Sequence, residues 1–190
     1  MRKLVVSEFL TLDDVMEGPG GDGEFKHAGW SMPYWDDEIG KLKFDELLAS
    51  DALLLGRVTY QGFAAAWPSM TDEAGFADRM NDIAKYVVST TLDKAEWNNT
   101  QIIKGDIVEE VTRLKRQPGQ NILVGGSGQL VQALARHNLV DDYYLLVYPV
   151  VLGSGKRLFR DGTEAVLKLV ESRSYASGVA LLHYQAAAGA

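Results

Sequence analysis

Cysteine is absent from the 190-residue sequence, and this absence excludes disulfides, thiolate zinc sites, iron–sulfur clusters and cysteine nucleophiles. Histidine is scarce as well. His27, His137 and His183 lie far apart in the sequence, so we expect no histidine metal site. Basic residues are outnumbered, with 19 Lys and Arg against 26 Asp and Glu and a formal net charge of −7. Because a nucleic-acid-binding protein needs a basic surface to meet phosphates, we expect no nucleic-acid partner.

Long hydrophobic runs are also missing. No apolar stretch approaches the roughly 18 residues that a membrane span needs, and the N-terminal segment meets Glu8 and Asp13 too early to form a signal-peptide core. We therefore expect a cytoplasmic protein with no membrane partner. Hydrophobic residues make up 46% of the chain, enough for a substantial core, and the length predicts one domain spanning residues 1–190.

Short apolar segments alternate with helical patterns along the chain. The patterns predict strands at residues 3–10, 52–55, 86–88, 101–103, 121–124 and 143–151, and helices at residues 36–49, from 59, within 72–83, from 107 to the Pro118-Gly119 stop, and at 129–137. Asp106 and Glu109 form a capping-box pattern at the start of the fourth helix. Residues 164–172 and 179–185 predict an antiparallel edge hairpin. This order predicts an α/β fold with a mostly parallel central sheet covered on both faces.

Residues 13–34 lack periodicity and contain five glycines and two prolines. A structureless stretch of this length in a compact domain is typical of a lid or binding loop, although a merely mobile insertion is the alternative. The aromatic residues Trp30, Tyr34 and Trp35 lie at its end. They form either a wall for a planar substrate or anchors that hold the loop to the core.

Three turns with phosphate-binding chemistry follow predicted strands. The glycine turn, residues 125–128 (Gly-Gly-Ser-Gly), opens a helix, but it lacks the third glycine of a dinucleotide fingerprint and the Gly-Lys-Ser/Thr of a P-loop. In the arginine turn, residues 56–59 (Gly-Arg-Val-Thr), Arg57 suits bidentate phosphate contact and Thr59 suits a helix cap. The hydroxyl turn, residues 89–91 (Ser-Thr-Thr), suits a monophosphate such as a 2′-phosphate.

Each turn alone has an ordinary structural explanation. Glycines suit any tight strand-to-helix connection, an exposed arginine beside a capped helix is common, and Ser and Thr are frequent loop residues. All three turns, however, lie at the carboxyl ends of predicted parallel strands, the edge where open α/β sheets bind ligands. Three phosphate-compatible turns on one edge indicate a dinucleotide.

In order and spacing these motifs resemble the dihydrofolate reductase superfamily. The sequence is most similar to the reductase domain of the bifunctional riboflavin-biosynthesis deaminase/reductase and its stand-alone relatives. The resemblance covers residues 2–185 and includes residues 5–7 (Val-Val-Ser), residues 11–13 (Thr-Leu-Asp) and residues 149–155 (Pro-Val-Val-Leu-Gly-Ser-Gly). It implies a three-layer dihydrofolate-reductase-like fold, NADPH as cofactor and hydride transfer to a small-molecule substrate. We also expect a homodimer, because the strand of residues 142–151 and the closing hairpin offer an extended sheet edge or face to a partner. The resemblance agrees, since the reductase domains of the family commonly pair through this part of the sheet.

The resemblance also assigns residues to the site. The arginine and hydroxyl turns are expected to hold the phosphates and the adenosine end, and the glycine turn and Ser7 the pyrophosphate and nicotinamide. The residues assigned to NADPH are Ser7, Gly56, Arg57, Thr59, Ser89, Thr90, Gly125, Gly126, Ser127 and Gly128. Phe44 falls at the family's substrate-stacking position and is expected to bind the substrate. Trp35 is expected to bind it as well, as part of the aromatic wall that residues 30–35 offer. The expected substrate is a planar heterocycle, pterin- or pyrimidine-like, or a carbonyl compound.

The chain departs from the family in its acid. Counting back from Gly56, the position of the carboxylate that assists protonation holds Gly40. Asp37, one turn earlier, is the candidate proton donor, although Asp36 and Asp37 are also typical of a solvated first helical turn. Asp14 replaces a glycine of the relatives, and the zinc-binding deaminase half has no counterpart. The alternative function is therefore a non-catalytic NADPH- or nucleotide-binding protein that keeps the fold; an oligomeric scaffold without a ligand is a third possibility.

Overall fold

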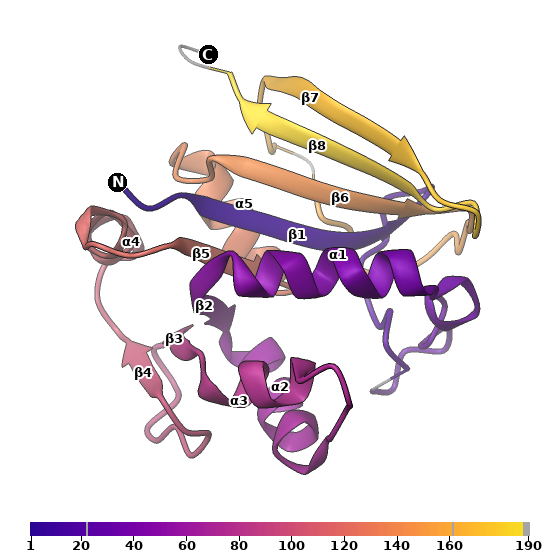
Figure 1. Ribbon diagram of the computed structural model, residues 1–190. Coiled ribbons are helices and arrows are strands. Elements are labelled where there is room, and N and C mark those ends of the chain that lie inside the picture. The colour runs from indigo at the N-terminus through magenta and orange to yellow at the C-terminus, as the bar shows by residue number, and fades with distance from the viewer. Residues whose placement is uncertain (22, 161, 188–190) are drawn as a thin grey trace.

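One eight-stranded sheet organises the chain in the computed structural model, which describes residues 1–21, 23–160 and 162–187 (Figure 1). The strands lie in the order β4-β3-β2-β5-β1-β6-β8-β7. β1 to β6 are parallel to one another, whereas β8 pairs antiparallel with β6, and β7 pairs antiparallel with β8 at the edge. The bounds are β1 Leu4–Thr11, β2 Ser50–Gly56, β3 Ala84–Val88, β4 Thr100–Ile103, β5 Asn121–Gly125, β6 Asp142–Tyr148, β7 Leu167–Ser174 and β8 Ala180–Ala186. The predicted fold class is confirmed.

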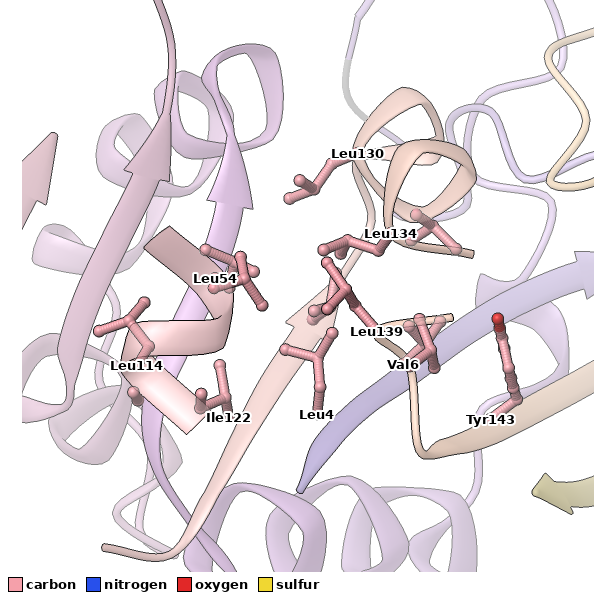
Figure 2. Close-up of a cluster of buried hydrophobic side chains, with 14 of the residues drawn as sticks. Leu4, Val6, Leu54, Leu114, Ile122, Leu130, Leu134, Leu139 and Tyr143 are labelled. Carbon is pink, nitrogen blue, oxygen red and sulfur yellow. The ribbon is translucent and has the colours of Figure 1, made fainter. Parts of the chain in front are cut away.

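Helices cover both faces of the sheet and make three layers. They are α1 Asp37–Leu48, α2 Arg57–Ala66, α3 Phe76–Asp82, α4 Ile107–Arg116 and α5 Gly128–Arg136, with short 3-10 helices η1 Met32–Tyr34 and η2 Trp67–Ser69. α1, α2 and α3 pack on one face through a cluster that includes Leu47, Tyr60 and Met80. α4 and α5 pack on the other, where Leu114 and Leu134 point toward the strands (Figure 2). Figure 1 shows α1 in front of β1 and α5 behind it.

The sequence explains most of these elements locally. Residues 52–55 of β2 are all buried, as expected for a parallel strand covered on both faces. The side chain of Asp36 accepts a hydrogen bond from the Ile39 N–H at 2.8 Å and fixes the start of α1. Asp106 accepts bonds from the N–H groups of residues 108 and 109 at 2.9 and 3.0 Å, so the predicted cap of α4 is confirmed.

Two predicted boundaries are wrong. β6 ends at Tyr148 rather than at residue 151, because Pro149 has no N–H to donate to a strand ladder, and Val151 is exposed. α2 begins at Arg57 with the extended residue Gly56 as its N-cap, so Thr59 lies inside the first turn and does not cap the helix. The closing hairpin is present as predicted, with each strand displaced toward the C-terminus by one to three residues.

The start of the predicted loop is tied to a distant segment, residues 150–159. The carboxylate of Asp13 accepts hydrogen bonds from the N–H groups of Leu152 and Gly153, and that of Asp14 accepts one from the Phe159 N–H. Asp14 has a positive φ of 65°, which a glycine in the relatives would adopt more easily. These contacts hold this part of the loop against the carboxyl edge of the sheet. Among the residues that the structure describes, no helix is long and apolar enough to cross a membrane.

Candidate cofactor and substrate site

The sheet order brings the three predicted turns together. They follow β2, β3 and β5, which are adjacent strands, so the turns are neighbours along the carboxyl edge. Gly56 pairs with Val88, immediately before the hydroxyl turn, and Ser7 pairs with Gly125 at the start of the glycine turn. The expected cofactor residues therefore lie on four consecutive strands and the loops and helices that follow them.

Two of the turns are in direct contact. The Gly56 N–H donates a hydrogen bond to Ser127 Oγ at 2.8 Å. Gly126 has a φ of +70°, and a Cβ atom built on it would lie 3.0 Å from Thr59 Cγ2. The glycine turn and the arginine turn thus form one platform, in which a side chain at position 126 would press on Thr59 and would have to adopt a strained positive φ. Arg57 is exposed on the same platform and donates to Gln61 Oε1 at 3.1 Å.

Within the described residues, the two helices that start at this platform, α2 and α5, lack the acidic groups that the other α-helices have at their first turns. α1, α3 and α4 each receive a carboxylate at their first N–H groups, from Asp36, Asp72 and Asp106. In the described chain α2 and α5 have no capping side chain and no acidic residue in the first turn. Free N–H groups and the positive ends of two helix dipoles therefore adjoin each other. This arrangement suits a ligand with two linked phosphate groups.

One hydroxyl group of the hydroxyl turn, that of Ser89, already makes hydrogen bonds in and next to the turn. Ser89 is buried, and its Oγ accepts hydrogen bonds from the N–H groups of Thr91 and Leu92 at 3.2 and 2.9 Å. The side chain of Thr90 is exposed beside it. Ser89 shapes the turn, and the exposed Thr90 and Thr91 side chains are available to a ligand, although Thr91 Oγ1 also lies 3.4 Å from Ser89 Oγ.

A buried polar cluster lies between β1 and α1, which the sequence did not predict. Lys43 Nζ donates to Ser7 Oγ at 2.6 Å and to Glu46 Oε2 at 2.7 Å, and it lies 5.3 Å from the centre of the Phe9 ring. The signal in the sequence is the spacing of Lys43 and Glu46, which places both on one face of a helix. That this face meets Ser7 depends on a contact 36 residues apart.

Glu8 is the second unpredicted residue. It is 4% exposed, and its Oε2 accepts a hydrogen bond from the Gly126 N–H at 3.1 Å. Burial raises the pKa of the Glu8 carboxyl to about 8, although the Gly126 N–H and the charge of Lys43 oppose the shift. Its Oε1 has no hydrogen-bond partner among the described residues. The signal in the sequence that could have identified Glu8 is an acidic residue within the otherwise apolar strand predicted at residues 3–10.

The aromatic residues divide between the two expected roles. Trp30 is buried, donates to the Glu17 carbonyl at 2.8 Å and meets the Tyr148 ring at 5.2 Å, so it anchors the loop. Trp35 is 49% exposed, with its ring 6.2 Å from that of Phe9. The indole also covers Gly40, since a Cβ there would lie 3.6 Å from it.

The remaining predicted residues lie on α1. Phe44 is half-buried and packs against Phe76, with ring centres 5.9 Å apart. Asp37 is exposed in the first turn, next to the capping residue Asp36. The structure thus brings together the predicted cofactor residues, while Asp37 lies at the surface, away from the buried pair formed by Glu8 and Gly126.

Comparisons with known proteins agree with this geometry. The family model of the RibD C-terminal domain matches residues 2–181. The uncharacterized protein YyaP of Bacillus subtilis (strain 168) is 32% identical over 187 residues, which cover 96% of this chain and 94% of that protein. A putative riboflavin biosynthesis protein from Shewanella sp. PV-4 superposes with a TM-score of 0.71 at 17% identity, over 97% of this chain and 99% of that chain. Dihydrofolate reductase from Enterococcus faecalis, complexed with NADP(H), superposes with a TM-score of 0.62 at 16% identity, over 97% and 96% of the two chains.

Proposed function

Because the chain belongs to the RibD C-terminal domain family, we propose that it is an NADPH-dependent reductase of a small planar heterocycle, pterin- or pyrimidine-like, or of a carbonyl compound. The observation that carries the proposal is the pair of adjoining helix starts, α2 and α5, which lack carboxylate caps in the described chain. Their N–H groups offer hydrogen bonds and partial positive charge to the pyrophosphate of a dinucleotide. When bound, NADPH supplies the hydride.

The chain's own residues divide the work of binding. Arg57 and Thr90, exposed at the arginine and hydroxyl turns, are proposed to meet the 2′-phosphate and the adenosine end. Gly126 allows the backbone of the glycine turn to approach the pyrophosphate and nicotinamide, with Ser7 at the nicotinamide end. These roles follow the order of the turns along the carboxyl edge, from β3 through β2 and β5 to β1.

The substrate is proposed to lie between the loop of residues 13–34 and α1. Trp35 offers half of its ring surface there, next to Phe9, and a planar ring can stack on such a face. Phe44 and the ammonium group of Lys43 lie on the same helix and supply an apolar wall and a positive charge. Asp37, the proton donor expected from the sequence, stays a prediction.

The second candidate is an NADPH-binding protein without reductase activity. It is favoured by Gly40, which stands where the resembled dihydrofolate reductases have a carboxylate and which is covered by the Trp35 ring. Calorimetric titration with NADPH, followed by NADPH oxidation over a panel of pterins, pyrimidines and quinones, separates the two. Binding with turnover of a panel member supports the reductase, and binding without turnover supports the second candidate. Absence of NADPH binding contradicts both.

We also propose a homodimer that forms through β7. The strand that the sequence offered for pairing, residues 142–151, is not at the edge, because β6 lies between β1 and β8. β7 is the outermost in the sheet order, and its Leu169 and Val170 are each 48% exposed. An edge strand with exposed apolar side chains and unpaired backbone groups favours addition of another strand. A second copy of β7, related by a twofold axis, would pair with these backbone groups and cover the exposed apolar side chains.

A further inference from the structure

Glu8 lies where β1 passes the end of its neighbour. Ser7 is the last residue of β1 that pairs with β5, opposite Gly125, whereas Glu8 still pairs with Leu145 of β6 on the other side. The side chain of Glu8 meets the first N–H beyond the end of β5, that of Gly126. We propose that Glu8 is the proton donor of the reduction, delivering its proton from Oε1 to a nitrogen or oxygen atom of the substrate. This inference rests on the proposed reductase function.

The position of Glu8 joins the two parts of the proposed nicotinamide site. Its neighbour in sequence is Ser7, and its hydrogen-bond partner belongs to the glycine turn. In the described chain its second oxygen, Oε1, is buried without a partner. A buried polar atom normally has a partner, so an unpaired one at this place indicates a group that the ligand completes.

Glu8 is a neutral acid at neutral pH, because its pKa is raised to about 8. The charges that act on it are that of Lys43, which lowers the pKa, and that of Glu46, which raises it, both on α1. Since Oε2 accepts the Gly126 N–H, the proton resides on Oε1. A carboxyl group with a pKa close to the working pH is well matched to general acid catalysis.

The reduction needs one proton in addition to the hydride, and Glu8 is proposed to supply it. When a carbon of a C=N or C=O group accepts hydride from the nicotinamide cofactor, the π electrons move to the nitrogen or oxygen. The Oε1–H bond of Glu8 then breaks as a new N–H or O–H bond forms on the substrate. Glu8 is left as a carboxylate that accepts the Gly126 N–H and is stabilised by the charge of Lys43, and it is reprotonated when product release opens the site to water.

Exposure separates Glu8 from the other acidic candidate. Asp37 is at the surface in the first turn of α1, where water competes for any proton that it carries. Glu8 is 4% exposed and shielded from solvent. The position that carries the acid in the resembled reductases, Gly40, has no side chain and is covered by Trp35.

The test compares wild-type protein with Glu8→Gln. Glutamine keeps an oxygen that accepts the Gly126 N–H and has nearly the same volume, but it has no proton to give. We expect kcat to fall by about 10²–10⁴-fold, with the NADPH dissociation constant changed by less than about 3-fold. The wild-type kcat is expected to fall as pH rises through about 8, and this limb is expected to vanish in the variant. Glu164→Gln, at an exposed residue outside the site, is the matched control.

A second measurement does not depend on turnover. In wild-type protein loaded with NADP⁺ and labelled with ¹³C at the glutamate carboxyls, the Glu8 signal, assigned as the one missing from Glu8→Gln, is expected to titrate with a midpoint near 8. A midpoint near the ordinary value of 4.5 overturns the proposal, and Glu8→Asp supplies the same assignment if Glu8→Gln does not fold.

The outcomes distinguish Glu8 from the function itself. An active wild-type enzyme whose Glu8→Gln variant keeps its turnover and its pH profile overturns the role of Glu8 alone. A wild-type protein that binds NADPH and oxidises it with no member of the panel overturns the reductase function, and the role of Glu8 as proton donor falls with it.

Discussion

Replacing Glu8 by glutamine is expected to change how stability depends on pH, whatever the substrate. The pKa of Glu8 is about 8 in the folded protein against an ordinary value of 4.5. The folded state therefore keeps a proton that the unfolded state releases between these values. The stabilisation from this proton is fully present below 4.5 and is lost as pH rises through about 8.

The size of the effect follows from the number of protons involved. Between about pH 5.5 and pH 7.5 the unfolded glutamate is charged and the folded one is mostly neutral, so stability falls by roughly 1.4 kcal/mol per pH unit. Over this window the wild type is expected to lose about 2–3 kcal/mol of unfolding free energy that Glu8→Gln keeps. Groups common to both proteins cancel in the difference, which isolates Glu8. In a chain of this size the loss corresponds to about 4–12 °C in Tm.

Urea unfolding followed by circular dichroism measures this difference. Both proteins are unfolded at several pH values across the window, and the unfolding free energies are extrapolated to water. We expect Glu8→Gln to become more stable relative to wild type as pH rises. Two curves that stay parallel across the window would mean that Glu8 ionises at its ordinary pKa, and the reasoning from burial would be wrong.

Four further predictions concern ligand binding, assembly and the acid. Arg57→Gln is expected to weaken NADPH binding by about 10- to 150-fold and NADH binding by less, because a charge-assisted contact to the 2′-phosphate contributes roughly 1.5–3 kcal/mol. Equal calorimetric affinities of the wild type for NADPH and NADH would contradict this assignment. Gly126→Val is expected to abolish NADPH binding while circular dichroism shows a folded protein. The valine side chain meets Thr59, and the positive φ costs about 1–2 kcal/mol. A folded variant that binds NADPH normally would show that the glycine turn has only a structural role. Light scattering is expected to give the mass of a dimer for the wild type and of a 20.9 kDa monomer for Leu169→Asp. A wild-type protein that stays monomeric at micromolar concentration counts against the β7 interface. For Asp37→Asn, a kcat lowered by about 10²–10⁴-fold with unchanged NADPH affinity supports the sequence-based acid, and retained turnover supports Glu8.

The fold could be predicted from the sequence because its signals are local. Continuous apolar runs such as residues 52–55 predict buried parallel strands, and Asp106 predicts a helix start with its own cap. The errors arose where backbone chemistry overrides side-chain pattern. At Pro149 the missing N–H ends β6 although the apolar residues continue, and at Gly56 an extended glycine rather than Thr59 caps α2.

The candidate site could be predicted only in part. The three turns were predicted because phosphate-compatible residues follow three predicted parallel strands, and the observed sheet order places these turns on one edge. Glu8 and Lys43 were not found because their roles depend on contacts that no local pattern encodes. The contact from Gly126 to Glu8 joins residues 118 positions apart, and the contact from Lys43 to Ser7 joins residues 36 apart.

The stability of the protein gives a separate reason to associate Glu8 with proton transfer. Its one contact with the glycine turn, the bond from the Gly126 N–H, needs only an oxygen acceptor, and glutamine offers the same atom. Above its ordinary pKa the buried carboxyl makes the fold less stable than a neutral side chain of equal size would. What glutamate provides at this position and glutamine does not is a proton that leaves near neutral pH. A residue that lowers stability while it offers only this property is best explained by chemistry that uses the proton.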